Sequence, residues 1–196
     1  MKNVSYWRET KIVKNKRGEY RINPYYGIGS FLVSQLVIDR FSSFLKSSKH
    51  PESVLDVGCG FMPHYVFFRE NLSIDKYVGI DWVNSPHTST CVDLLMNLNE
   101  PLELNGVYDF VLLMDVLEHL SNVSTVLVSV KEHLSENGKI FITVPFYYWI
   151  HEAPFDFNRY TIYQLKSMFN LPTCSLPLDS YCAASMSCTF TGSYFF

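Results

Sequence analysis

The sequence predicts an α/β fold built on a mostly parallel β-sheet, and three segments support this. Residues 54–60 (VLDVGCG) predict a buried strand that runs into a tight turn with two glycines. Residues 77–81 (YVGID) predict a second strand that ends in an acid. Residues 108–114 (YDFVLLM) are nearly all apolar, which is typical of a central parallel strand covered on both faces. Helical segments alternate with these strands, so right-handed crossovers are expected.

The other elements are predicted from apolar spacing and from breaker residues. Helices are predicted over residues 30–46, 64–71 and 121–134 and from about Thr161, with Ser121 as the N-cap of the third. Further strands are predicted over residues 88–92, 139–144, 175–178 and 187–194, and residues 94–106 are expected to be irregular.

The length of the chain suits one domain. It has 196 residues, of which 47% are hydrophobic, so it can bury a full-sized core. We expect a polar N-terminal arm over residues 1–27, a core over 28–170 and an atypical tail over 171–196. The five cysteines are odd in number and have no paired spacing, which argues against a disulfide framework or a zinc site built from cysteine.

Charge and hydropathy exclude two classes of partner. The formal net charge is −3, so no general attraction to nucleic acid is expected. Positive charge gathers only in the N-terminal arm, which we interpret as a solvated segment, at Lys11, Lys14, Lys16, Arg17 and Arg21. No apolar run reaches the roughly 18 residues that a membrane span needs, and residues 1–8 lack an apolar signal core. These features predict a cytoplasmic protein without a membrane span.

The carboxyl ends of the strands are the expected ligand site, as in other open α/β sheets. Gly58 and Gly60 would let a ligand approach the backbone, although a glycine pair is also common in ordinary strand-to-helix turns. Asp81 could accept hydrogen bonds from both hydroxyls of a ribose, or it could cap the following turn. Pro63 stands where a dinucleotide-binding turn needs its third glycine, and this argues against NAD or FAD.

Two neighbouring positions could complete a nucleoside site. Trp82 could flank an adenine or pack in the core. Asp93 could meet an adenine amino group or cap a turn. The predicted cofactor-binding residues are Asp56, Gly58, Gly60, Asp81, Trp82, Asp93, Leu94 and Met114.

Taken in order, these segments resemble the motifs of class I S-adenosylmethionine-dependent methyltransferases. The resemblance covers roughly residues 50–170 and includes 54–60, 77–81, Asp93, 108–120 and 137–146. Residues 115–120 (DVLEHL) resemble the small-molecule methyltransferase branch. Residues 151–161 (HEAPFDFNRYT) resemble a segment of bacterial and archaeal members that is often linked to glycan or surface-polymer pathways, by association only.

The resemblance implies a three-layer, Rossmann-like methyltransferase fold with S-adenosylmethionine as cofactor. It places cofactor contacts at Gly58, Gly60, Asp81 and Asp93 and around Met114. Two features depart from the family. Met62 replaces a common third glycine, so the turn could be reshaped. The tail offers little room for the C-terminal antiparallel hairpin of the family, which could therefore be incomplete.

The reaction implied is displacement at the sulfonium methyl, in which alignment of the reactants is the main contribution. A base is needed when the acceptor is a hydroxyl or a protonated amine. His119 and His151 are the candidate catalytic residues, although a lone histidine is more often structural. Asp156 and Arg159 could hold a polar substrate or brace the following helix, and bracing is favoured for Tyr160.

A divalent metal is an alternative use of the same residues. Asp115, Glu118 and His119 are spaced i, i+3, i+4, so they would share one face of a helical turn. With His151 they could hold an ion that orients acceptor hydroxyls. A few metal-dependent relatives show a similar pattern, usually with Glu at the first position. We leave metal out of the predicted site residues.

The predicted function is S-adenosylmethionine-dependent methyl transfer to an oxygen or nitrogen of a small polar or glycan-like acceptor. The alternative is a non-catalytic binding or partner protein that keeps the methyltransferase scaffold. A nucleic-acid methyltransferase is disfavoured because residues 115–118 (DVLE) replace the Asn/Asp-Pro-Pro-aromatic tetrapeptide of many amino-directed DNA enzymes.

Overall fold

The computed structural model describes residues 12–14, 20–22, 45, 51–62, 64–72, 74–85, 92–146, 148–168 and 185–191. Its main sheet has the strand order β5-β4-β3-β6-β7-β8. The strands are β3 (Ser53–Val57), β4 (Lys76–Asp81), β5 (Leu94–Leu95), β6 (Tyr108–Met114), β7 (Leu134–Pro145) and β8 (Ser185–Thr191). All neighbours pair in parallel except β7 and β8. The mostly parallel α/β fold is confirmed.

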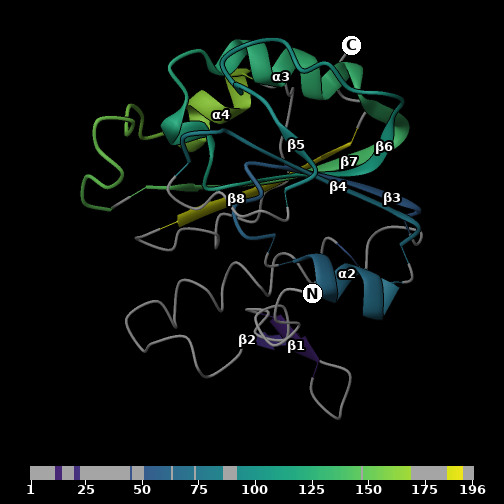
Figure 1. Cartoon of the computed structure of the whole chain (residues 1–196). Helices are drawn as coiled ribbons and strands as arrows, with labels where there is room; N and C mark the ends of the chain where they lie inside the picture. The colour runs from purple at the N-terminus through teal and green to yellow at the C-terminus, as the bar shows by residue number, and fades with distance from the viewer. Residues whose placement is uncertain are drawn as a thin grey trace.

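Helices cover both faces of the sheet, which gives three layers (Figure 1). Helices α3 (Val123–Glu132) and α4 (Ile162–Met168) lie on one face, and α2 (Tyr65–Leu72) lies on the other. The two faces have separate apolar clusters, the larger of which includes Leu55, Val111 and Ile140. The smaller cluster, on the α2 side, includes Phe68 and Phe141. Beside the main sheet, β1 (Ile12–Lys14) and β2 (Tyr20–Ile22) form an antiparallel pair within the predicted arm.

The central strands and several helices match the prediction. The apolar run 108–114 is β6, and α2 follows the glycine turn as expected. The helix predicted near Thr161 is α4, and the Thr161 hydroxyl oxygen accepts a hydrogen bond from the backbone of Gln164 at 3.2 Å. Residues 117–119 form the short 3-10 helix η3 (Leu117–His119), shortly after β6.

The prediction of Ser121 as a helix cap is wrong. Helix α3 begins at Val123, and Asn122 occupies the N-cap position without a side-chain capping bond. The Ser121 hydroxyl instead donates a hydrogen bond to the side-chain oxygen of Asn99, which also accepts one from the Asn122 backbone. A partner distant in sequence has therefore replaced the local cap.

Two strand boundaries also differ from the prediction. Strand β7 begins at Leu134, before the predicted start at residue 139, and an irregularity in its pairing with β6 accommodates Asn137 and Gly138. The predicted strand 88–92 lies outside the described residues apart from Val92, and β5 begins at Leu94, where residues 94–106 were expected to be irregular. The backbone of Asp93 donates a hydrogen bond to Gly79 of β4, which aligns the next two residues with β4.

The tail contributes an antiparallel edge strand. Strand β8 pairs with β7 from Ser185 to Thr191, close to the predicted 187–194. The predicted strand 175–178 and the helix predicted over 30–46 lie outside the described residues, apart from Leu45. Within the described part of the chain, no helix is both long and apolar enough to cross a membrane.

Candidate active site

The glycine turn after β3 is held against the neighbouring strand. Gly58 and Gly60 have φ angles of 74° and 52°, which a residue with a side chain rarely adopts. The backbone N–H groups of Gly58 and Cys59 both donate to the carbonyl oxygen of Ile80, at 2.8 and 3.0 Å. A Cβ atom on Gly58 would collide with the side chain of Val116. Glycine is therefore needed here for both backbone conformation and space.

Met62 takes the position of the family's third glycine and is accommodated by a different glycine. It has a φ of 52° and is buried, and its backbone N–H donates to the carbonyl of Cys59 at 2.7 Å. A Cβ atom on Gly79 would lie 2.8 Å from Met62 Cε and 2.9 Å from Cys59 Sγ. Because Gly79 lacks a side chain, the Met62 thioether can pack over β4. Pro63, which argued against a dinucleotide, lies outside the described residues.

Asp81 joins the glycine turn to the end of β4. Its side chain is buried, and its two oxygens accept hydrogen bonds from the backbone N–H groups of Gly60 and Trp82, at 2.8 and 2.7 Å. Each carboxylate oxygen can accept a second hydrogen bond. The group therefore caps the turn, and its contact with a ribose remains a prediction.

The other predicted cofactor-binding acids have structural partners. Asp56 lies inside β3, where it accepts a 2.5 Å hydrogen bond from the hydroxyl of Tyr77. Burial raises the pKa of Asp56 to about 7, against the opposing effect of that hydrogen bond. The Asp93 carboxylate accepts a hydrogen bond from the backbone of Gly79 at 2.8 Å. Cofactor contacts by Asp56 and Asp93 remain predictions, as do those by Leu94 and Met114.

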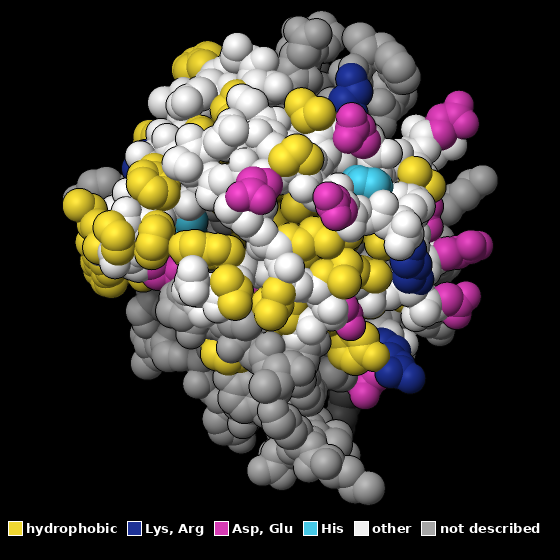
Figure 2. Space-filling view, turned by 45° about the horizontal axis from the view of Figure 1, so that its top comes forward, with side chains coloured by type: hydrophobic (Ala, Val, Ile, Leu, Met, Phe, Trp, Pro, Cys, Tyr) yellow, Lys and Arg dark blue, Asp and Glu magenta, His cyan; other side chains and the backbone are white. Residues whose placement is uncertain are grey.

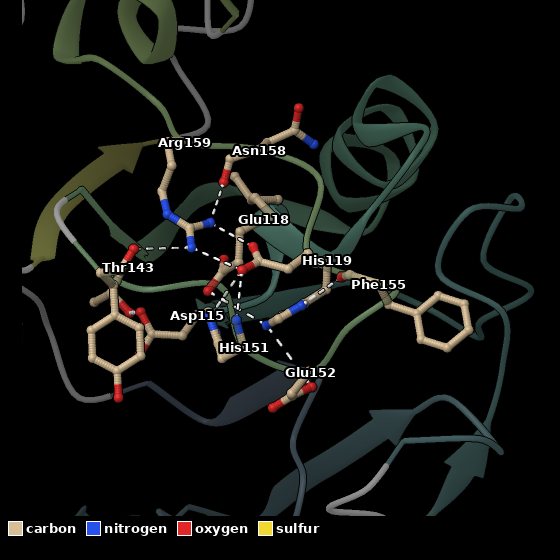
Figure 3. Close-up of polar contacts among 12 residues, drawn as sticks. Asp115, Glu118, His119, Thr143, His151, Glu152, Phe155, Asn158 and Arg159 are labelled. Carbon is tan, nitrogen blue, oxygen red and sulfur yellow. Dashed lines mark hydrogen bonds and ion pairs between the residues drawn. The ribbon is translucent and has the colours of Figure 1, made fainter.

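Two predicted catalytic histidines, distant in sequence, meet near the ends of β6 and β7 (Figure 3). His119 lies at the end of η3, and His151 lies in the loop after β7. Their ring centroids are 4.8 Å apart, with the edge of one ring toward the face of the other. Glu118 joins them to form a group of three potential ligands whose donor atoms all lie within 4.8 Å of one another.

The neighbours of His119 determine which ring nitrogen carries the proton. Its Nδ1 atom lies 2.7 Å from the backbone carbonyl oxygen of Phe155, which can only accept a hydrogen bond. Nδ1 is therefore the protonated nitrogen of the neutral ring, and Nε2 carries a lone pair. Nε2 lies 3.8 Å from Glu118 Oε1 and 3.9 Å from Glu152 Oε2.

His151 is oriented in the same way. Its Nδ1 atom lies 3.2 Å from Asp156 Oδ2 and 3.3 Å from the carbonyl oxygen of Trp149, both of which are acceptors. Asp156 also accepts a hydrogen bond from the His151 backbone and a two-pronged ion pair from Arg159. The hydrogen bonds and charge of Arg159, aided by His151, hold the pKa of Asp156 well below its usual range. Asp156 and Arg159 thus fix the loop that carries His151.

Glu118 is buried, and neither of its carboxylate oxygens makes a hydrogen bond in the described structure. Burial and the nearby charge of Asp115 raise the pKa of Glu118 to about 9. Asp115 itself accepts a hydrogen bond from the Thr143 hydroxyl at 3.0 Å and lies outside the group of three. The predicted four-ligand set of Asp115, Glu118, His119 and His151 is therefore reduced to three residues.

Comparison with known proteins decides the family. Residues 32–173 match the model of a family described as a methyltransferase domain. The chain belongs to this methyltransferase family. The predicted resemblance to class I S-adenosylmethionine-dependent methyltransferases is thereby confirmed, and with it the expected cofactor.

Among sequence relatives, the ubiquinone biosynthesis O-methyltransferase of Rickettsia akari is 25% identical over 140 residues, which are 66% of this chain and 53% of that protein. The chain thus spans about half the length of this relative.

Two solved structures share the methyltransferase fold. One is a complex between the Haloferax volcanii Trm112 methyltransferase activator and a candidate methyltransferase, with a TM-score of 0.53, 16% identity and coverage of 76% of this chain and 82% of that one. The other is an O-methyltransferase from a trans-AT polyketide synthase of Brevibacillus brevis, solved with S-adenosyl-L-homocysteine. Its TM-score is 0.52, with 12% identity and coverage of 76% and 60%.

In this methyltransferase, an aromatic contact links the nucleoside side to the histidine side. The rings of Trp82 and Phe155 meet edge to face, with centroids 5.0 Å apart. Trp82 directly follows Asp81, and the backbone of Phe155 orients His119. Trp82 was predicted to flank an adenine or to pack in the core, and its contact with Phe155 adds a role that the sequence did not indicate.

Among the described residues, three that are not glycine have a left-handed backbone, and they lie in or near this region. Met62, Asp115 and Glu152 have φ angles of 52°, 56° and 53°. Such conformations cost about 1–3 kcal/mol each and tend to cluster at functional sites. Met62 lies in the glycine turn, Asp115 follows β6, and Glu152 is beside His119. Glu152 belongs to the segment 151–161 noted in the sequence, but it was not predicted as a site residue.

Exposed aromatic side chains lie around the histidines. Tyr148, Trp149 and Phe155 are 46%, 73% and 42% exposed, in the loop that carries His151. Figure 2 shows hydrophobic side chains gathered along one edge of the described surface. An apolar surface of this kind beside polar groups is typical of a binding region.

Proposed function

We propose that this protein transfers the methyl group of S-adenosylmethionine to an oxygen or nitrogen of a small polar or glycan-like acceptor, and that a hydroxyl is the favoured acceptor group. The observation that carries this proposal is the lone pair on His119 Nε2. The backbone of Phe155 orients His119, and the ring of Phe155 contacts Trp82, which lies next to the predicted nucleoside site.

The nucleoside half of the proposed site consists of the glycine turn and Asp81. S-adenosylmethionine supplies a methyl group that is already activated by a positively charged sulfur. Asp81 would accept hydrogen bonds from the ribose hydroxyls, and Gly58 and Gly60 would admit the rest of the molecule close to the backbone. Trp82 would form one wall of this nucleoside site. Holding the two reactants in line can contribute up to about 7–11 kcal/mol of barrier reduction.

The acceptor half depends on His119 as a general base. A hydroxyl placed at Nε2 would give its proton to the ring as the oxygen attacks the methyl group. Glu118 and Glu152, whose oxygens lie 3.8 and 3.9 Å from Nε2, would stabilise the charged ring when they are ionised. Base catalysis of this kind contributes about 10²–10⁴-fold. His151 would be a second polar contact for the acceptor.

The acceptor proposed is small and contains a ring. Trp149 and Tyr148 offer exposed aromatic faces beside the histidines, and such faces stack on planar rings or on the apolar face of a sugar. The Rickettsia akari relative is an O-methyltransferase, which supports oxygen as the methylated atom. We treat the chain as a single methyltransferase domain, and the family match over residues 32–173 supports a core close to 28–170.

The test is a methyl-transfer assay with S-adenosylmethionine labelled in its methyl group. The acceptor panel contains phenols, catechols, sugars and amines, and calorimetry with S-adenosylhomocysteine is run in parallel. We expect cofactor binding and transfer to at least one hydroxyl acceptor. Binding without transfer to any acceptor would favour the non-catalytic alternative, and absence of binding by the folded protein would contradict the proposal as a whole.

A further inference from the structure

We propose that Glu118, His119 and His151 bind one divalent transition-metal ion of the zinc class. One potential ligand atom from each residue lies within 4.8 Å of the others. Bonds of about 2.0–2.2 Å to a tetrahedral ion separate its ligand atoms by up to about 3.5 Å. Side-chain movements of roughly 1 Å would therefore close the three residues on an ion.

The burial of Glu118 is the strongest indication of a ligand. Its side chain is 0% exposed, and both carboxylate oxygens lack a hydrogen bond within the described residues. A buried polar group without a partner costs about 1–3 kcal/mol, and more when it is charged. Coordination of a cation would satisfy these oxygens and remove that cost. No donor among the described residues forms a hydrogen bond with the Glu118 oxygens.

Both histidines are oriented as metal ligands usually are. The carbonyl oxygen of Phe155 holds the Nδ1 proton of His119, and Asp156 with the carbonyl of Trp149 holds that of His151. In each ring the Nε2 lone pair is then available. A backbone carbonyl or a carboxylate on the second nitrogen is the usual support of a metal-binding histidine.

Local charge also favours a cation. The carboxyl groups of Asp115 and Asp156 lie near Glu118, together with the positive side chain of Arg159. A Glu152 carboxylate oxygen lies 3.9 Å from His119 Nε2. Arg159 is neutralised by its two contacts with Asp156, at 2.5 and 2.8 Å. A set of two imidazoles and one carboxylate suits zinc and other transition metals better than magnesium or calcium.

Three protein ligands leave an open position, which is typical of catalytic metal sites. This chemical step rests on the proposed function. The acceptor hydroxyl would bind the ion, which lowers the pKa of that hydroxyl, and its proton would leave to solvent. The oxygen then forms a bond to the methyl carbon, the carbon–sulfur bond breaks, and the electron pair stays on sulfur. The oxidation state of the metal does not change. In this version of the mechanism the His119 lone pair binds the ion, so His119 is a metal ligand and not the general base.

The test uses the full chain after removal of metals with a chelator. Zn²⁺ is titrated by calorimetry, and Co²⁺ is titrated by visible absorption, because bound thiolates give a distinct charge-transfer band. We expect one ion per chain without thiolate bands. Glu118→Gln and His151→Gln should each weaken Zn²⁺ binding by at least about tenfold, while Asp115→Asn should retain it. If the substitution of the buried Glu118 prevents folding, the His151→Gln variant still tests the site.

Three results would overturn the metal site. They are absence of Zn²⁺ binding by the folded protein, binding that both Gln variants retain, and Co²⁺ bound through thiolates. Methyl transfer is then compared before and after chelation with an acceptor from the panel. Activity that survives chelation would reject the catalytic step alone, and a metal-binding protein without any transferase activity would reject the proposed function but not the site.

Discussion

His119 Nδ1 lies 2.7 Å from the carbonyl oxygen of Phe155, so a backbone group of one loop determines the reactive nitrogen of a side chain on another element. We predict that His119→Asn lowers methyl transfer by at least about 100-fold. The Asn amide can still donate to the Phe155 carbonyl, but it provides no base or ligand at the position of Nε2. The measurement is kcat with an acceptor from the panel, together with urea denaturation.

His133→Asn is the matched control. His133 Nδ1 lies 2.9 Å from the carbonyl oxygen of Gly106, a similar contact to a backbone carbonyl in another part of the chain. We expect full activity from this variant. An equal loss of activity in the two variants would show that the effect reflects folding and would contradict a role for Nε2.

Asp81→Asn should weaken binding of S-adenosylhomocysteine by about tenfold or more, because hydrogen bonds to a charged acceptor are worth about 1.5–3 kcal/mol. The amide keeps the shape of the side chain but loses the charge and one acceptor. Calorimetry measures the affinity. The control is Asp75→Asn, an exposed carboxyl just before β4. Unchanged affinity in the Asp81 variant would remove this residue from the nucleoside site.

Gly58→Ala should destabilise the fold more than Gly106→Ala. Both glycines have positive φ angles, 74° and 81°, so both substitutions strain the backbone by about 1–2 kcal/mol. Only at Gly58 does the new Cβ collide with Val116, whereas at Gly106 the new Cβ would lie 3.9 Å from Lys76 Nζ, an ordinary contact distance. We expect an additional loss of about 1–3 kcal/mol in the free energy of unfolding. Adding Val116→Ala to Gly58→Ala should recover part of the lost free energy of unfolding. Equal losses of stability in Gly58→Ala and Gly106→Ala would contradict a collision with Val116.

Tyr160→Phe should lower the free energy of unfolding by about 1–3 kcal/mol. The buried Tyr160 hydroxyl donates a 2.9 Å hydrogen bond to the carbonyl oxygen of Leu117, which the variant leaves without that donor. Tyr163→Phe is the control, since Tyr163 is 77% exposed on α4. Chemical denaturation of both variants measures the effect. Equal stability would argue against the bracing role that the sequence predicted for Tyr160.

Glu118→Gln should change how stability depends on pH in metal-free buffer. Burial raises the pKa of Glu118 from 4.5 to about 9, so the folded chain binds the proton more tightly than the unfolded chain does. The resulting stabilisation is complete below the unfolded pKa and is lost as the pH rises through the folded value. The wild type should therefore lose stability relative to the variant between about pH 5 and 9.

Urea midpoints measured at several pH values in the presence of a chelator provide the measurement for Glu118→Gln. Asp115→Asn removes the second cause of the raised pKa and should narrow the pH range of the effect. A constant difference between the wild type and the Glu118 variant across this range would contradict the buried, protonated state of Glu118.

The predictions of β6 and of the glycine turn succeeded because each depends on a single local property of the sequence. The apolar run of β6 must be covered on both faces, and the two glycines permit a backbone that other residues avoid. The cap was predicted wrongly because a distant partner, Asn99, took the hydrogen bond of Ser121. The short strand β5, in a stretch expected to be irregular, was missed because Asp93 and Gly79 align it through hydrogen bonds with β4. Local propensity contains no information about such partners.

The sequence by itself determined the α/β class, the glycine turn and the candidate histidines, because strand hydropathy and glycine backbone freedom are local properties. Only the tertiary structure decided that Glu118, His119 and His151 meet and that Asp115 does not join them. The meeting depends on a loop after β7 that Arg159 and Asp156 hold in place, and on a burial that deprives Glu118 of hydrogen bonds. Such convergence follows from chain packing across many residues, which no short pattern specifies.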